Sequence, residues 1–194
     1  MMRKGFTLVE LLIVIALLGV IAMVVIAAIN PIEQSNRARD TRFKSDGAQL
    51  ISAIDRYFAA SNEFPWVTAG VVTSNDAEFG FVTAGAEGIG LCGADCSTDG
   101  ALITSDELKS EFRNRDFVDA TTADKQLFIG KGAGTSESIY ACYIPAAKAN
   151  RDKSVADGKV YTINQTDGTR SPTTTCDADG ADWVTNGCFV CIPE

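Results

Sequence analysis

Residues 6–29 form a predominantly apolar run that contains a single charged side chain, the carboxylate of Glu10. About 20 apolar residues are enough to cross the hydrocarbon core of a membrane as a helix. The run is too long for the apolar region of a secretory signal peptide, which has about 7–15 residues. A charge inside a membrane costs about 2.5–3.5 kcal/mol or more, so such an acid marks a functional site with a partner. We therefore expect an apolar helix whose one acid meets a positive group.

A basic pair, Arg3 and Lys4, precedes the sequence Gly-Phe-Thr-Leu-Val-Glu at residues 5–10. This arrangement resembles the N-terminus of type IV prepilins, which has a basic leader, Gly, Phe-Thr-Leu-x-Glu and a long apolar helix. The resemblance implies that a prepilin peptidase and methyltransferase removes a leader of residues 1–5 by cutting after Gly5 and methylates the new amine of Phe6. It also implies that Glu10 neutralises the N-terminal amine of a neighbouring copy in a filament.

A second helical segment is predicted after Pro31. Apolar residues recur there at spacings of three and four, which is typical of one buried helix face. We expect one long helix over residues 6–60, bent or joined near Pro31. Its apolar half, residues 6–29, would be the membrane and filament-core helix, and its amphipathic half, residues 30–60, would pack on a globular head. The polar stretch 34–44 is expected to be solvated. A membrane anchor, a linker and a separate helix remain the alternative. The stripe consists of Phe43, Gly47, Leu50, Ile51, Ile54, Tyr57 and Phe58.

The remaining residues, 61–194, are expected to form the head. Strand-like runs occur at 126–130, 138–144, 160–164 and 188–192, separated by glycine-rich turns, and they predict a small antiparallel sheet against the helix stripe. Residues 66–100 are interpreted as an irregular connection. Residues 105–115 are predicted to form a short helix, with Thr104 and Glu107 as a capping box. The fold class is therefore α+β, and the resemblance implies a type IV pilin-like arrangement.

Six cysteines, all within residues 92–191, indicate disulfides formed in an oxidising, extracytoplasmic compartment. Cys188 and Cys191 are three apart on a predicted strand and point to opposite faces, so they should not bond each other. Cys92 and Cys96 would form a small local ring. The resemblance implies that Cys176 bonds either Cys188 or Cys191, which leaves the other for Cys142.

A calcium loop is a further hypothesis. Asp95, Ser97, Asp99 and Asp106 place oxygen ligands at positions one, three, five and twelve of a loop with glycine at position six, as in an EF-hand. The residues before Asp95 do not have the pattern of the helix that precedes an EF-hand loop. A helix cap at Thr104 would explain the same stretch without a metal. No other cofactor is expected.

Charge and motifs limit the function. Residues 60–194 hold ten basic and twenty acidic side chains, a net charge of −10, which disfavours direct nucleic-acid binding. The chain has no histidine, and it has no nucleophile, phosphate-loop or nucleotide motif. We expect a non-enzymatic, homo-oligomeric subunit of a helical surface filament, held in the inner membrane before the pilus assembly machinery moves it to the cell surface. The alternatives are a pseudopilin of a type II secretion or DNA-uptake system and, from other classes, a membrane-anchored calcium-binding module or enzyme.

Overall fold

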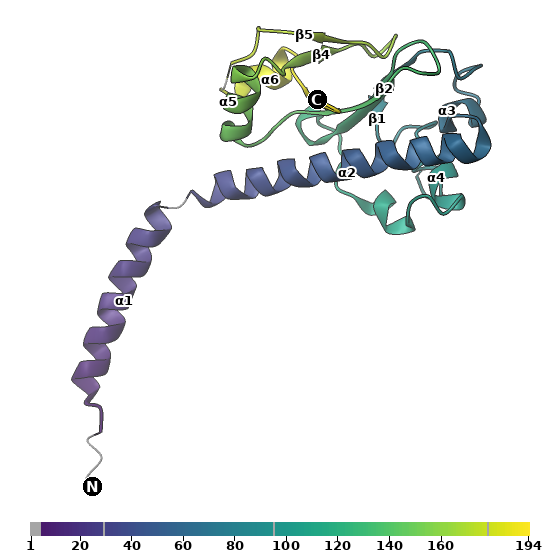
Figure 1. Cartoon of the computed structure of the whole chain (residues 1–194). Coiled ribbons are helices and arrows are strands. Elements are labelled where there is room, and N and C mark those ends of the chain that lie inside the picture. The colour runs from purple at the N-terminus through teal and green to yellow at the C-terminus, as the bar shows by residue number, and fades with distance from the viewer. Residues whose placement is uncertain (1–4, 29, 95, 178) are drawn as a thin grey trace. The chain divides into compact units, whose positions relative to one another are not determined.

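The computed structural model describes residues 5–28, 30–94, 96–177 and 179–194, without the side chains of residues 27, 28 and 181 (Figure 1). The chain divides into two compact units, an N-terminal unit ending at Ser35 and a globular unit of Asn36–Glu194.

Two long helices form the N-terminal third of the chain: α1 covers Leu8–Ala28 and α2 covers Pro31–Ser61. Pro31 lies at the first position of α2, where its missing N–H costs no helical hydrogen bond. Asn30 precedes it and accepts the backbone N–H of Glu33 on its side-chain oxygen at 3.2 Å. This contact is a helix cap. Both predicted helical halves are therefore confirmed, and Pro31 begins the second.

A four-stranded antiparallel sheet lies at the centre of the globular unit in the order β1-β2-β3-β6. The central pair keeps regular register, with Ile129 opposite Ala141. The pairing of β1 with β2 contains an irregularity between Phe79 and Val82. The strands are β1 (Phe79–Thr83), β2 (Leu127–Lys131), β3 (Ile139–Tyr143) and β6 (Val190–Ile192).

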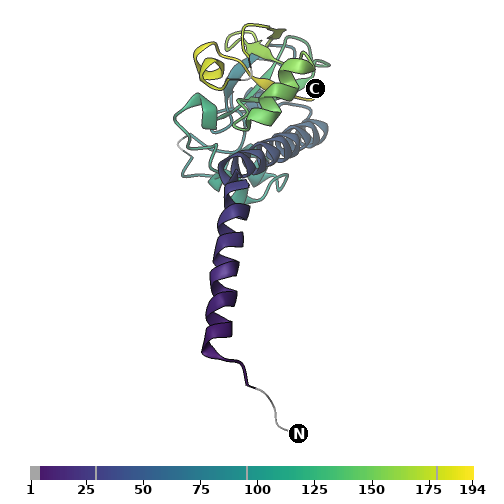
Figure 2. The ribbon, with the colours of Figure 1, turned by 90° about the vertical axis from the view of Figure 1, so that its left-hand side faces the viewer.

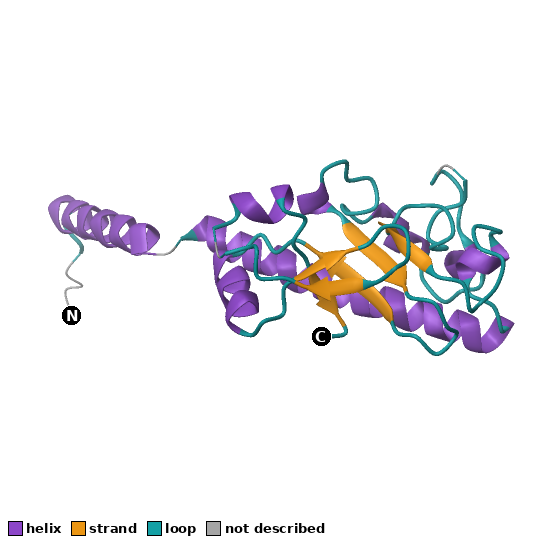
Figure 3. Cartoon of the chain, turned by 90° about the horizontal axis from the view of Figure 1, so that it is seen from above, coloured by secondary structure: helices purple, strands orange, loops and turns teal. Residues whose placement is uncertain are grey.

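The apolar stripe of α2 packs on one face of this sheet, as predicted, and the strands cross the helix in Figure 3. Leu50 and Ile54 are completely buried there. Gly47 allows the close approach, because a Cβ at this position would lie 2.8 Å from Ile192 Cδ1 and 3.1 Å from Ala141 Cβ. Burial contributes about 25 cal/mol per Å² of apolar surface, so this layer stabilises the globular unit.

The opposite face of the sheet is also buried, which the sequence pattern did not predict. Phe128, Cys142 and Cys191 contribute to a second apolar cluster, with Trp183 completely buried in it. A hairpin of β4 (Tyr161–Ile163) and β5 (Arg170–Pro172) and the short helix α6 (Ala181–Thr185) lie on the side away from α2 in both views (Figure 1, Figure 2). The globular unit is therefore layered on both faces of the sheet.

Short helical segments fill the connections. The stretch 66–100, interpreted from the sequence as irregular, in fact contains β1 and most of α3, and α4 follows it directly. The edge strand was missed because the run is short and Gly80 lies inside it, which weakens the strand signal. The segments are α3 (Pro65–Thr68), α4 (Ala101–Thr104), the 3₁₀ helices η1 (Ser110–Asn114) and η2 (Ala123–Lys125), and α5 (Lys148–Ala156).

The predicted helix over residues 105–115 is wrong, because only η1 forms there. Asp106 has φ of +61°, a left-handed conformation that interrupts a right-handed helix. Thr104 ends α4 instead of capping a helix, and its hydroxyl donates to the carbonyl of Gly100 at 3.1 Å. Glu107 is not part of a capping box, because its carboxylate accepts a hydrogen bond from Arg56 of α2 at 2.7 Å.

Candidate functional site

Helix α1 carries its apolar side chains entirely on the outside. Their exposed fractions run from 45% at Val14 to 78% at Leu8. The segment Leu8–Ile26 has a mean hydropathy of 3.1 and is long and apolar enough to cross a membrane. Such a surface is not stable in water, so a lipid bilayer or other apolar helices must cover it.

Glu10 interacts with Thr7 at the start of α1. The backbone N–H and the hydroxyl of Thr7 both donate to Oε2 of Glu10, at 2.9 and 2.8 Å, and the N–H of Glu10 donates back to the Thr7 hydroxyl at 3.2 Å. This is a capping box, which satisfies two otherwise unpaired N–H groups of the first turn. Both bonds from Thr7 reach Oε2 of Glu10, so neither of them uses Oε1.

The predicted processing residues lie just before this turn. Phe6 is 80% exposed, and Gly5 has no other atom within 4 Å of the position its Cβ would take. An extended, uncrowded segment of this kind is accessible to a peptidase. The leader residues Arg3 and Lys4 lie outside the described residues.

The six cysteines form three pairs: Cys92 with Cys96, Cys142 with Cys191, and Cys176 with Cys188. Cys142 and Cys191 face each other directly across β3 and β6. The third pair closes the loop that contains α6. The alternatives that the sequence left open for Cys188 and Cys191 are thus resolved in the structure. Disulfides of this kind are typical of extracytoplasmic proteins.

The candidate calcium ligands are only partly described. Asp95 lies outside the described residues. Asp99 forms an ion pair with Arg113, with Oδ1 2.9 Å from Nη1. Ser97 and Asp106, which come before and after Asp99 in the sequence, are exposed. Within the described residues, no group of three or more His, Cys, Asp or Glu side chains is placed to hold a metal ion. Calcium binding in this loop stays a prediction.

Two buried acids in α2 were not anticipated: Asp40 lies in the polar stretch 34–44, which was expected to be solvated, and Asp46 lies just after it. Asp40 is completely buried and accepts hydrogen bonds from the backbone N–H groups of Ala146 and Ala147. Asp46 is 2% exposed, and burial raises its pKa, while the nearby Arg115 and Arg42 partly offset the rise. The spacing indicated their position: Asp40 precedes Phe43 by three residues and Asp46 precedes Leu50 by four, so both lie beside the apolar stripe.

A third buried charge, Lys131 in β2, is also without exposed surface. Its Nζ donates to the carbonyl oxygens of Asn75 at 3.2 Å and Gly132 at 3.0 Å and lies over the ring of Phe64. Burial is the main reason that its pKa is lowered. The sequence did not indicate that Lys131 is buried. Its partners are backbone carbonyl groups, which any residue type can supply.

Comparison with known proteins finds a family match for the N-terminal segment. Residues 1–26 match the family model described as the prokaryotic N-terminal methylation motif. No curated protein and no solved structure matches the chain. The match includes the predicted cleavage position, the capping box and most of α1, and the α+β fold of the remaining residues is consistent with a pilin-like protein. The chain therefore carries the prokaryotic N-terminal methylation motif, which is the signature of type IV prepilins.

Proposed function

We propose that this protein is a structural subunit of a type IV pilus-like surface filament. A prepilin peptidase would cut after Gly5, the new amine of Phe6 would be methylated, and copies would polymerise through α1. Before assembly the subunit would be anchored in the inner membrane by α1, with the globular unit outside. The role is structural rather than catalytic.

The observation that carries this proposal is the single carboxylate at the start of an otherwise apolar helix. Cleavage would create a cationic amine at Phe6, next to a helix N-terminus that already carries a partial positive charge. In an apolar bundle this charge requires a carboxylate. Because Thr7 occupies only Oε2 of Glu10, Oε1 would be available for the amine of a neighbour displaced along the helix axis.

The globular unit supports an extracytoplasmic location. Its three disulfides join cysteines in the sheet, in the α6 loop and beside α4. The net charge of −10 over residues 60–194 favours a soluble outer surface and disfavours direct contact with phosphate backbones. The alternative of a pseudopilin in a secretion or DNA-uptake system shares the processing and the helix pairing, and it differs in fibre length.

The test is fibre formation by cells that produce the wild-type chain, Glu10→Gln or, as a control for the same chemical change, Glu33→Gln at the start of α2. We expect Glu10→Gln to be processed and to stay in the membrane without assembling, because it retains the size of the side chain but loses its charge. Glu33→Gln should assemble. Wild-type fibre yield from Glu10→Gln would contradict the proposal. Electron microscopy of long surface fibres would separate a pilin from a pseudopilin.

A further inference from the structure

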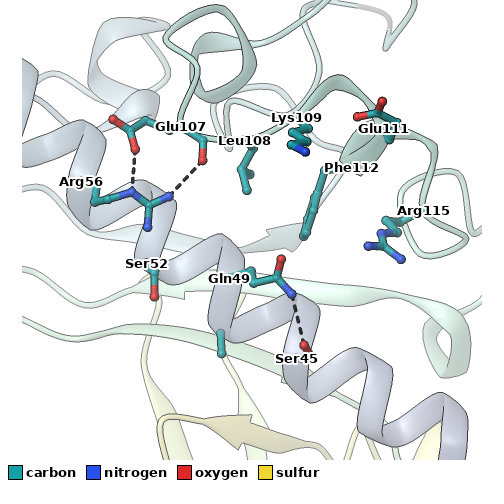
Figure 4. Close-up of a pocket in the computed structure, with 11 residues that line it drawn as sticks. Ser45, Gln49, Ser52, Arg56, Glu107, Leu108, Lys109, Glu111, Phe112 and Arg115 are labelled. Carbon is teal, nitrogen blue, oxygen red and sulfur yellow. Dashed lines mark hydrogen bonds and ion pairs between the residues drawn. The ribbon is translucent and has the colours of Figure 1, made fainter.

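A groove runs along the globular unit between α2 and residues 107–115, with a cavity volume of about 690 Å³ (Figure 4). Its floor on α2 consists of small and polar side chains, including Ser45, Gln49 and Ser52. Leu108 and Phe112 reach toward α2 from the opposite wall. This volume lies within the range of about 300–1,000 Å³ that is typical of small-molecule sites.

One end of the groove is closed by a paired charge. The guanidinium of Arg56 donates to the Glu107 carboxylate at 2.7 Å and to the Glu107 carbonyl at 2.9 Å. At the other end, Arg115 lines both the groove and an adjoining hollow of about 150 Å³. The Arg115 side chain therefore forms part of the wall of both spaces.

A buried carboxylate with an unused acceptor lines this adjoining hollow. The side chain of Asp46 is 3% exposed, and its Oδ1 lies 3.7 Å from Nη2 of Arg115. Its Oδ2 has no hydrogen-bond partner in the described part of the chain. A buried carboxylate oxygen without a donor is costly, so a donor from a bound molecule would stabilise this arrangement. Asn114 lines the same hollow and adds an amide that both donates and accepts.

The charges around the hollow balance. Asp46 and Asp116 face Arg42 and Arg115, and Arg42 pairs with Asp116 at 3.4 Å. With two charges of each sign around it, the hollow gives neither an added cation nor an added anion a net attraction. A carboxylate only accepts hydrogen bonds and a guanidinium only donates them, so a group that does both satisfies the two together. Hydroxyl groups have this property without carrying charge.

The longer groove has matching chemistry. Gln49 presents an amide, with its nitrogen donating to Ser45 at 3.1 Å. Lys109 and Glu111 have opposite signs at its rim. The apolar side chains of Leu108 and Phe112 provide a surface for the C–H face of a sugar ring. We propose that this groove binds a neutral saccharide, with hydroxyl groups placed between Asp46 and Arg115 and further rings along Gln49 and Phe112.

The test uses the full-length chain in a zwitterionic detergent without a sugar headgroup, so that the detergent does not compete. Saturation-transfer NMR would be recorded with lactose, maltose, cellobiose and N,N′-diacetylchitobiose, and with glucuronate and glucosamine as charged probes. We expect saturable binding of at least one neutral disaccharide and weaker binding of both charged sugars.

Two groove variants and one matched control locate the site. Asp46→Asn and Gln49→Ala should each weaken binding about tenfold or more, because each removes hydrogen-bond acceptors or donors from the site. Asp55→Asn makes the same chemical change on α2 outside the groove and should bind as the wild type does. The proposal is overturned if no neutral disaccharide binds, if only a charged probe binds, or if Asp46→Asn and Asp55→Asn bind equally well.

Discussion

The carboxylate of Asp40 in α2 accepts the backbone N–H of Ala147 at 3.0 Å, across 107 residues of sequence. Ala147 is the N-cap residue of α5 and has no side chain that can cap the helix. Asp40 supplies the missing acceptor and also receives the N–H of Ala146 at 2.8 Å and the amide of Asn150 at 2.7 Å. One buried acid thus fixes the segment that leaves β3 against the long helix.

Replacing this acid should be strongly destabilising. Asp40→Ala leaves two backbone donors near the start of α5 without an acceptor, at a cost of about 3 kcal/mol or more in unfolding free energy. Urea unfolding can be followed by the fluorescence of Trp66 and Trp183, which are both completely buried. The exposed Asp119→Ala should change stability by less than about 0.5 kcal/mol. Equal effects of the two substitutions would show that the Asp40 contacts do not hold α5.

The architecture could be predicted from the sequence where periodicity is strong. The stripe from Phe43 to Phe58 identified the helix, and three of the four strand-like runs identified most of the sheet. The fourth run, 160–164, was placed in the same sheet but forms β4 of a separate two-stranded sheet. The buried Asp40 and Lys131 were missed because their partners are far apart in sequence: Asp40 meets Ala147, and Lys131 meets Asn75. Local sequence patterns do not predict contacts between residues so far apart in the chain. Glu10 was identified from a motif, whereas Asp46 and the groove beside it became visible only in three dimensions.

The two longer disulfide loops should differ in their contribution to stability. Cys142 and Cys191 are separated by 49 residues, and Cys176 and Cys188 by 12. In the chain-entropy model these loops contribute about 4 and about 3 kcal/mol. The double substitution Cys142→Ala/Cys191→Ala should therefore lower the urea midpoint more than Cys176→Ala/Cys188→Ala does. The reverse order would show that native-state packing, rather than loop closure, determines their effects.

The buried Asp46 should make stability depend on pH. Its pKa is raised above the ordinary value of 3.8, mainly by burial. The folded state therefore holds the proton more tightly, and this group's contribution to unfolding free energy falls as pH rises from 3.8 through the raised pKa. Asp46→Asn does not titrate. Urea midpoints should be measured from pH 3.5 to 7. The midpoint of the variant minus that of the wild type should increase across this window and then stay constant. A constant difference would contradict the assignment.

Lys131 should produce the opposite slope at alkaline pH. Burial lowers its pKa below the ordinary value of 10.5, so the unfolded chain binds the proton more tightly. Its contribution to unfolding free energy then rises with pH between the lowered pKa and 10.5. Lys131→Met lacks this titration, so the unfolding free energy of the wild type should increase relative to that of the variant over that window. Comparing the two chains at each pH removes the effect of Tyr143, whose raised pKa acts on both. A gap that stays the same throughout would mean that Lys131 is not desolvated.

The processing of the N-terminus is the most direct test of the proposed filament subunit. Mass spectrometry of the protein purified from cells that carry a prepilin peptidase should find a chain that begins at Phe6 and bears one added methyl group on its amine. A chain that retains Met1, or one cut near Ala28 after the apolar segment, would contradict the account.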